Sequence, residues 1–245
     1  MKILVCISHV PDTTSKISFV SDGSSLDKNG VQFVINPYDE FGLTKAMMLK
    51  EANGGKVTVI TAGDITIEPV IRKALAIGAD DAVRIDVEPK DAYSAAMQIA
   101  SYAKENAYDL VLTGKETINY NGSQVGGMIA AGMDLPFISL ASKLEVNGST
   151  AKLETETIGG LEVVEVDLPA VISCAKGMAE QRIPNMRGIM TARSKPLEVI
   201  EATENNNLTE SILFEKPALK AECKIISSDN VGELVNELHN VAKVI

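Results

Sequence analysis

The sequence predicts an α/β fold, in which helices cover both faces of a doubly wound, mostly parallel sheet. Apolar runs of strand length alternate with helix-spaced segments from the first residue to about residue 136. The runs at residues 2–8 and 56–62 are almost continuously apolar, which is typical of strands that are buried on both faces. This alternation is the pattern of parallel strands joined by right-handed helical crossovers.

Each predicted element follows from its spacing and its stop signals. Leu43, Ala46 and Met47 recur at helical intervals, and Gly54 marks the end of that helix. The strands predicted for the parallel sheet comprise residues 2–8, 31–35, 56–62, 82–85, 109–113 and 170–175. The predicted helices comprise residues 39–52, 68–77, 93–106 and 123–133.

After Pro136 the pattern changes to one of hairpins. The dipeptides Asn147-Gly148 and Gly159-Gly160 are turn signals between strand-like runs. These runs comprise residues 137–146, 151–157 and 161–166. The segment 137–167 is therefore predicted to be an antiparallel meander attached to the parallel sheet.

The chain is long enough for one large domain with an appendage, and its core signals fade towards the C-terminus. We expect one α/β domain over residues 1–197, followed by a C-terminal arm over residues 198–245. The arm contains an amphipathic helix over residues 230–244. Such a short arm holds no core of its own, so it is expected to pack on the domain or on another chain.

The composition disfavours several classes of function. The net charge of −10 argues against a nucleic-acid surface, which needs clustered Lys and Arg. Three separated cysteines and two histidines give neither metal-ligand spacing nor a Ser/His/Asp or Cys/His catalytic set. The N-terminus does not read as a signal peptide, and no apolar run approaches about 20 residues, so we expect a cytoplasmic protein without membrane insertion.

Ligands of open α/β sheets bind at the carboxyl ends of the strands, where three predicted loops emerge. Two are residues 8–12 and 62–64, and the third, residues 114–124, reads GKETINYNGSQ. Residues 121–123 suit a tight turn and a helix N-cap, and the free amides of residues 124–126 would face a phosphate. An ordinary capped loop is the alternative, and neither GxGxxG nor GxxxxGK[ST] is present.

A second constellation, Asn36-Pro37-Tyr38-Asp39-Glu40, lies where the helix predicted at residues 39–52 begins. Proline and carboxylates in a first turn are ordinary start signals of a helix. Alternatively, Asn36 and Tyr38 contact a base or ribose from the helix entrance. The residues alone thus indicate a nucleotide-binding α/β domain in which no catalytic set is visible.

These motifs resemble the β subunits of the electron-transfer flavoproteins over essentially the whole chain. Six motifs occur in order, at residues 1–12, 34–43, 73–85, 109–136, 156–174 and 180–199. The resemblance implies an adenine nucleotide α-hydrolase-like fold and a heterodimer with an α subunit, on which the C-terminal arm packs. The α subunit holds most of an FAD that carries electrons, whereas the β subunit binds a structural AMP.

The resemblance also implies a set of cofactor-binding residues. They are Cys6, Asn36, Pro37, Tyr38, Asp39, Ala62, Gly114, Lys115, Glu116, Thr117, Ile118, Asn119, Tyr120, Asn121, Gly122, Ser123, Gln124 and Val125. Many members carry an acidic run where this chain has residues 119–121, so side-chain contacts there are expected to differ. A subset of the family binds a second FAD in place of AMP and bifurcates electrons, and residues 123–126 partly resemble that subset.

Residues 180–192, within the predicted domain, resemble the family's recognition loop, which anchors acyl-CoA and related dehydrogenases of fatty acid oxidation. The implied partner-binding residues are Arg182, Met186, Ile189 and Met190. A flexible thioether at Met186 suits several partners, and burial in the core is the alternative. Two other classes of protein stay open: a stress-type protein that binds ATP reversibly, and an enzyme with an adenylated intermediate, for which a reactive side chain is missing.

Overall fold

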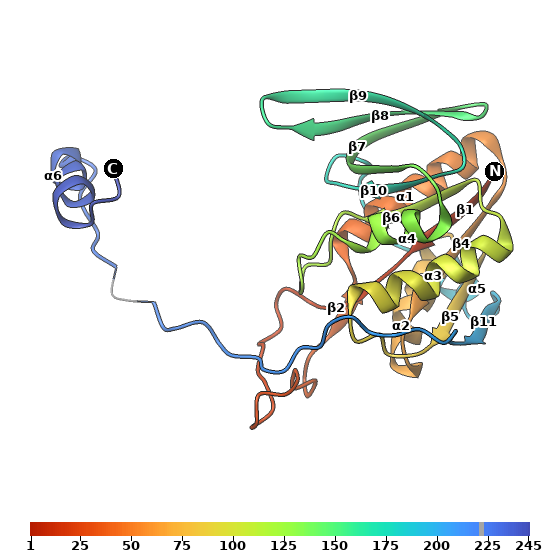
Figure 1. The fold of residues 1–245 in the computed structure, drawn as a ribbon, viewed down its shortest axis with the longest axis horizontal. Helices are drawn as coiled ribbons and strands as arrows, with labels where there is room; N and C mark the ends of the chain where they lie inside the picture. Colours follow the sequence, from red (N-terminus) through yellow and green to blue (C-terminus); the bar gives the residue numbers. More distant parts are fainter. Residues whose placement is uncertain (221–222) are drawn as a thin grey trace.

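The computed structural model describes residues 1–220 and 223–245, and its centre is a nine-stranded sheet (Figure 1). From one edge to the other, the strands are β11 (Leu197–Glu201), β5 (Asp81–Asp86), β4 (Lys56–Ala62), β1 (Lys2–Cys6), β6 (Leu110–Gly114), β10 (Ala170–Cys174), β7 (Phe137–Asn147), β8 (Thr150–Thr157) and β9 (Gly160–Asp167). Pairing is parallel from β11 to β7 and antiparallel from β7 to β9. The predicted α/β class, with a parallel sheet and a meander, is confirmed.

The strand order reverses beside β1. Strands β4 and β5 lie on one side of β1, whereas β6 and β10 lie on the other side. In a doubly wound sheet such a switch point leaves a crevice at the carboxyl ends of the strands. The ends of β1 at Cys6 and of β6 at Gly114 therefore border the place where a ligand is expected.

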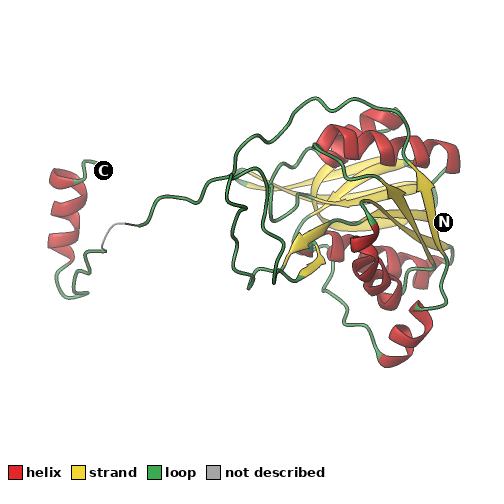
Figure 2. Ribbon diagram, turned by 90° about the horizontal axis from the view of Figure 1, so that it is seen from below, coloured by secondary structure: helices red, strands yellow, loops and turns green. Residues whose placement is uncertain are grey.

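Helices cover both faces of the parallel part of the sheet (Figure 2). One face is covered by α1 (Pro37–Asn53) and by α2 (Glu68–Ile77), which follows a short 3-10 turn, η1 (Ile65–Ile67). The other face is covered by α3 (Ala92–Asn106) and α4 (Val125–Met133). Both faces are thus withdrawn from water, which explains why the strands are almost continuously apolar.

The run predicted as a strand at residues 31–35 pairs outside the main sheet. It forms β3 (Phe33–Ile35), which is antiparallel to β2 (His9–Pro11), a strand that the sequence did not predict. The imidazole of His9 stacks on the ring of Phe33, with the centroids 4.2 Å apart. This pair returns the chain to the carboxyl end of β1, where α1 begins.

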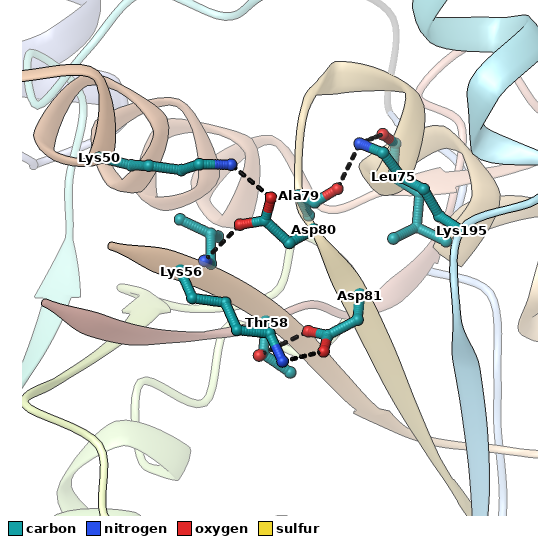
Figure 3. Close-up of polar contacts among 9 residues, drawn as sticks. Lys50, Lys56, Thr58, Leu75, Ala79, Asp80, Asp81 and Lys195 are labelled. Carbon is teal, nitrogen blue, oxygen red and sulfur yellow. Dashed lines mark hydrogen bonds and ion pairs between the residues drawn. The ribbon is translucent and has the colours of Figure 1, made fainter. Parts of the chain in front are cut away.

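The edge strand β11 lies across the predicted domain boundary, which falls after its first residue. Strand β11 pairs in parallel with β5, and α5 (Met186–Ala192), which precedes it, packs on α2. Between them, the Lys195 ammonium donates to the carbonyl oxygens of Leu75 and Ala79 at the end of α2 (Figure 3). This lysine holds the chain beside β5, so the sheet continues through residue 201.

A cluster of ion pairs closes the opposite, amino-terminal end of β4 and β5 (Figure 3). The Lys50 ammonium donates to the carboxylate of Asp80 at 2.5 Å. Asp81 pairs with Lys56 and accepts a hydrogen bond from the hydroxyl of Thr58 at 2.7 Å. These carboxylates therefore support the end of the sheet that lies away from the switch-point crevice.

The C-terminal arm leaves the domain after β11 and ends in a helix that stands apart from it (Figures 1 and 2). This helix, α6 (Val231–Asn236), continues into a π-helical segment, η2 (Glu237–Val241), so the helix predicted at residues 230–244 forms in its central part. Residues 221 and 222 of the predicted arm lie outside the described residues. None of the described helices is long and apolar enough to cross a lipid bilayer.

Candidate functional site

A cavity of about 430 Å³ opens at the carboxyl ends of β1, β4 and β6, beside the switch in strand order. Its size is typical of small-molecule pockets, which range from about 300 to 1,000 Å³. Its walls come from the ends of these strands, the loops after β5 and β6, the first turn of α4 and the start of the C-terminal arm. The three loops that the sequence places at strand ends therefore meet here.

The carboxylate of Asp39 joins three of these segments. It accepts hydrogen bonds from the backbone amide of Ser8 at 2.7 Å, the backbone amide of Gly114 at 3.0 Å and the side-chain amide of Asn36 at 2.9 Å. Burial raises the pKa of Asp39 to about 7, against the opposing effect of these donors. The carboxylate thus holds the ends of β1 and β6 against the start of α1.

Asn36 supports the loop after β6 and does not line the cavity. Its buried side chain donates to the carbonyl oxygen of Glu116 at 2.8 Å and accepts from the backbone amide of Ile118 at 3.2 Å. Tyr38 does not line the cavity either, and the Lys115 ammonium lies 4.8 Å from its ring centroid. Both side chains therefore shape the loop that forms the cavity wall.

Helix α4 begins at Val125, two residues later than predicted. Its N-cap residue is Gln124, and within the described part of the chain no side chain caps its first amides. Ser123, the expected cap, has a φ of 52° and donates its hydroxyl to the Glu116 carboxylate at 3.0 Å. This left-handed backbone differs from the extended one of an N-cap, so the first-turn amides stay available to another acceptor.

The hydroxyl of Thr113 lies beneath this helix start and has no hydrogen-bond partner among the described residues. Thr113 lines the cavity and is 4% exposed. Gly126 lets the helix come this close, because a Cβ there would lie 2.8 Å from the Thr113 hydroxyl and 2.9 Å from the ring of Phe137. The absence of a side chain at Gly126 therefore serves the close packing of α4 on the sheet.

The structure brings most of the predicted cofactor-binding residues to this cavity. Those that line it are Cys6, Asp39, Ala62, Gly114, Lys115, Glu116, Thr117, Asn119, Tyr120, Gly122, Ser123, Gln124 and Val125. Those that do not line it are Asn36, Pro37, Tyr38, Ile118 and Asn121. The second group belongs to the start of α1 and to the turn after β6, so it supports the first.

Sequence reasoning missed the loop after β5 and the start of the arm. The missed lining residues include Lys28, Glu88, Lys90, Asp91, Thr209 and Ser211. The sequence contained a signal for the helix start at Asp91. Asp91 precedes the helix and Ser94 occupies its N3 position, and the two residues form a capping box. Thr209 and Ser211 carried no such signal, because only the path of the arm in space brings them to the cavity.

Two of the three cysteines, Cys6 and Cys174, are buried, whereas Cys223 is exposed. Cys6 lines the cavity, where burial and then the charge of Asp39 raise the pKa of its thiol. Burial likewise raises the pKa of Cys174 to about 12. No cluster of three or more His, Cys, Asp or Glu suited to a metal ion occurs in the described ranges. The cavity is therefore equipped to bind a ligand through backbone amides, hydroxyls and lysines.

A separate surface is formed by α5 and the residues before it. Four apolar side chains are exposed here, namely Ile183, Met186, Ile189 and Met190. Met186 is 73% exposed, so the alternative that it belongs to the core is excluded. Arg182 donates to both carboxylate oxygens of Glu51, at 2.6 and 2.8 Å, which ties this segment to α1.

Comparison with known proteins agrees with this architecture. The family model described as electron transfer flavoprotein domain matches residues 24–205, which include most of the cavity wall and α5. A Bacillus subtilis protein named electron transfer flavoprotein subunit beta is 34% identical over the full length of both chains. The protein of that name from Bradyrhizobium diazoefficiens is 33% identical, again over both full lengths.

The likeness extends to mammals. The electron transfer flavoprotein subunit beta of Homo sapiens is 33% identical over 82% of this chain and 81% of that protein. The full-length relatives cover the whole sheet, the cavity loops and the meander, and the family model covers all of these except β1, β2 and the loop between them. The chain therefore belongs to the family of electron transfer flavoprotein β subunits.

Proposed function

We propose that this chain is the non-catalytic subunit of a heterodimeric electron carrier and that its cavity holds AMP in a structural role. The observation that carries the nucleotide site is the uncapped first turn of α4 directly above the Thr113 hydroxyl, which has no partner among the described residues. A buried hydroxyl of this kind costs about 1–3 kcal/mol unless another group satisfies it. A phosphate at this point would accept from the helix amides and from the hydroxyl together.

The charges around the cavity favour one orientation of the nucleotide. The first turn of α3 also lines the cavity, but the carboxylate of Asp91 already accepts from the Ser94 amide there, at 2.7 Å. A second anion would be repelled at that end. Near α4, the carboxylate of Glu116 is paired with Lys115 at 3.0 Å. The phosphate therefore belongs at α4, and the nucleoside belongs at the end lined by α3.

The redox chemistry in this proposal belongs to an FAD that the α subunit mostly holds, while the β chain supplies position. The arm would pack on that subunit. Support comes from the terminal helix, which stands apart from the domain (Figure 1). This helix exposes apolar side chains such as Val231, Val235 and Val241. An isolated helix of this length is marginal in water, so it gains its stability from a partner surface.

The surface around α5 would dock flavoprotein dehydrogenases of the acyl-CoA type. Two observations support this role. The methionines are exposed and flexible. The backbone that carries them is held in place, because Arg182 pairs with Glu51 and the Asn185 side chain accepts from the Gly188 amide at 2.8 Å. Positive charge from Arg187 and neighbouring basic residues would steer an acidic partner.

The second candidate function is electron bifurcation, with a second FAD in place of AMP. Residues 123–126 favour it, because they partly resemble the bifurcating subset. The start of the arm favours the mononucleotide, since Thr209 and Ser211 form a wall at the nucleoside end, where the rest of an FAD would have to extend.

Co-expression of this chain with its α subunit, followed by extraction of the bound ligands, tests the proposal. We expect one FAD and one AMP per heterodimer. Two flavins without AMP would replace the AMP assignment with the bifurcating one. A homodimer that releases ATP on dialysis and purifies without a flavin-bearing partner would contradict the carrier function.

A further inference from the structure

The first part of the C-terminal arm forms part of the wall of the cavity. After β11 the chain follows α3, where the side chain of Gln98 donates to the Thr203 carbonyl at 2.7 Å and accepts from the Thr203 amide at 2.9 Å. Thr209 and Ser211 then line the cavity itself. Specific contacts thus hold this part of the arm at the site.

Asp91 is the first anchor of this segment. One carboxylate oxygen caps α3 through the Ser94 amide, and the other accepts the backbone amides of Leu208 at 2.6 Å and Thr209 at 2.8 Å. Burial acts to raise the pKa of Asp91, but these amide donors outweigh it and lower the pKa to about 2. The carboxylate is therefore ionised at neutral pH, and it ties the arm to the helix start at the nucleoside end.

The second anchor lies outside the cavity, at Phe214. Its backbone amide donates to the Gly23 carbonyl at 2.8 Å, and its ring centroid lies 5.5 Å from that of Phe19. The segment 208–214, which we call the strap, is thus attached at both ends. Its middle passes the cavity between the two anchors.

We infer that the strap forms the outer wall of the nucleotide site and that the hydroxyls of Thr209 and Ser211 contact the nucleoside. This inference rests on the proposed nucleotide site and adds residues to it. With the phosphate at α4, the nucleoside lies between α3 and the strap. The strap, held by Asp91 and by the contact of Phe214 with Phe19, then covers one side of the nucleoside and opposes its departure.

The same geometry couples the nucleotide to the rest of the arm. Binding free energies are reciprocal, so a nucleotide that contacts the strap holds it on the domain, and a held strap retains the nucleotide. Because the arm continues from the strap to the exposed helix α6, a partner that fixes that helix would slow nucleotide release.

Two variants loosen the strap at different anchors. D91N keeps the cap of α3, because Asn and Asp are nearly equivalent N-caps, but it replaces one acceptor oxygen with an amide donor. F214A removes the ring contact with Phe19 and does not alter the cavity lining. D12N is the matched control, since it removes the same charge from an exposed side chain that does not line the cavity.

Release of radiolabelled AMP from the purified heterodimer, in excess unlabelled AMP, is the measurement. We expect D91N and F214A each to release AMP roughly tenfold faster than the wild type. This factor corresponds to the loss of one charge-assisted hydrogen bond in D91N and of one well-packed ring contact in F214A. The double variant should be faster still, and D12N should match the wild type. Hydrogen exchange in residues 208–214 should slow when AMP binds the wild type.

The outcomes separate the two proposals. If D91N, F214A and the double variant retain AMP and release it at the wild-type rate, the strap inference is wrong and the nucleotide site still stands. If D91N does not fold, F214A decides the question, because its anchor is remote from α3. A heterodimer that contains no nucleotide and takes up no added AMP would overturn both proposals.

Discussion

The backbone amide of Gly114, at the end of β6, donates a hydrogen bond of 3.0 Å to the carboxylate of Asp39, at the start of α1. The same carboxylate accepts the amide of Ser8, which follows β1. A Cβ on Gly114 would overlap this carboxylate and lie 2.9 Å from the Cβ of Tyr38. The closest approach of β6 and α1 therefore depends on glycine, and the loop of the candidate phosphate site starts from this point.

G114A is expected to lower the free energy of unfolding by about 1–3 kcal/mol, because the new methyl group has no space, and to reduce the AMP content of the heterodimer. Urea denaturation and nucleotide extraction measure the two effects. G122A is the control, since a Cβ at Gly122 would meet no atom within 4 Å, and it should change stability by less than about 0.5 kcal/mol. An equal decrease in the unfolding free energy of G114A and G122A would contradict the packing argument.

T113V is expected to affect stability and binding in opposite directions. Removing a partnerless buried hydroxyl should raise the unfolding free energy of the nucleotide-free protein by about 1 kcal/mol, while AMP binding weakens roughly tenfold. Thr44 also has a buried hydroxyl without a partner in the described part of the chain, but it does not line the cavity. T44V should therefore stabilise the protein without changing the AMP affinity.

Denaturation of the nucleotide-free protein and titration calorimetry with AMP separate these effects. An AMP affinity that is unchanged in T113V would remove Thr113 from the phosphate site. A similar loss of affinity in T44V would show that the effect is not specific to the cavity.

Asp39 should make stability depend on pH. Its pKa is raised by burial from the ordinary value of 3.8 to about 7 in the folded state, so between these values the folded chain binds more protons than the unfolded chain. The contribution of this group to stability therefore falls as pH rises from about 4 to about 7 and is level above that range. D39N removes this titration and leaves the other groups in place.

The measurement is the unfolding free energy of wild type minus that of D39N, from urea denaturation at about pH 5 and about pH 8. We expect this difference to be smaller, or more negative, at the higher pH. A difference that does not change with pH would mean that Asp39 titrates alike in the folded and unfolded chains.

The exposed methionines of α5 should matter for docking and not for folding. Because Met186 and Met190 are 73% and 71% exposed, the double variant M186A/M190A should change the unfolding free energy by less than about 0.5 kcal/mol. With an acyl-CoA dehydrogenase as electron donor, it should raise the apparent KM for the carrier more than it lowers kcat. L161A on β9, where Leu161 is 62% exposed, is the control and should leave KM unchanged.

Much of the fold could be predicted because its signals are local. Burial on both faces makes the parallel strands continuously apolar, and the turn signals at Gly148 and Gly159 coincide with positive φ angles between β7, β8 and β9. The switch-point rule then placed the candidate site at the ends of β1 and β6, where the cavity lies.

The roles of individual residues were less predictable. Asn36 matched a nucleotide-contacting motif, yet its side chain is fully buried and satisfied by the loop after β6. Ser123 suited an N-cap by type, but its backbone angle turns it towards Glu116. Residue type limits what a side chain can do, and the local backbone decides which of those bonds it makes.

The sequence by itself determined the class of sheet, the meander and the loops at the strand ends, because periodicity and turn chemistry act between residues close together in the chain. The family followed from the resemblance of six motifs that occur in order along the chain. Only the tertiary structure decided that Thr113 lacks a partner, that β11 extends the sheet and that Asp91 binds the amides of Leu208 and Thr209. Such contacts join segments that are remote in sequence, so they depend on the path of the chain in space and leave no pattern along it.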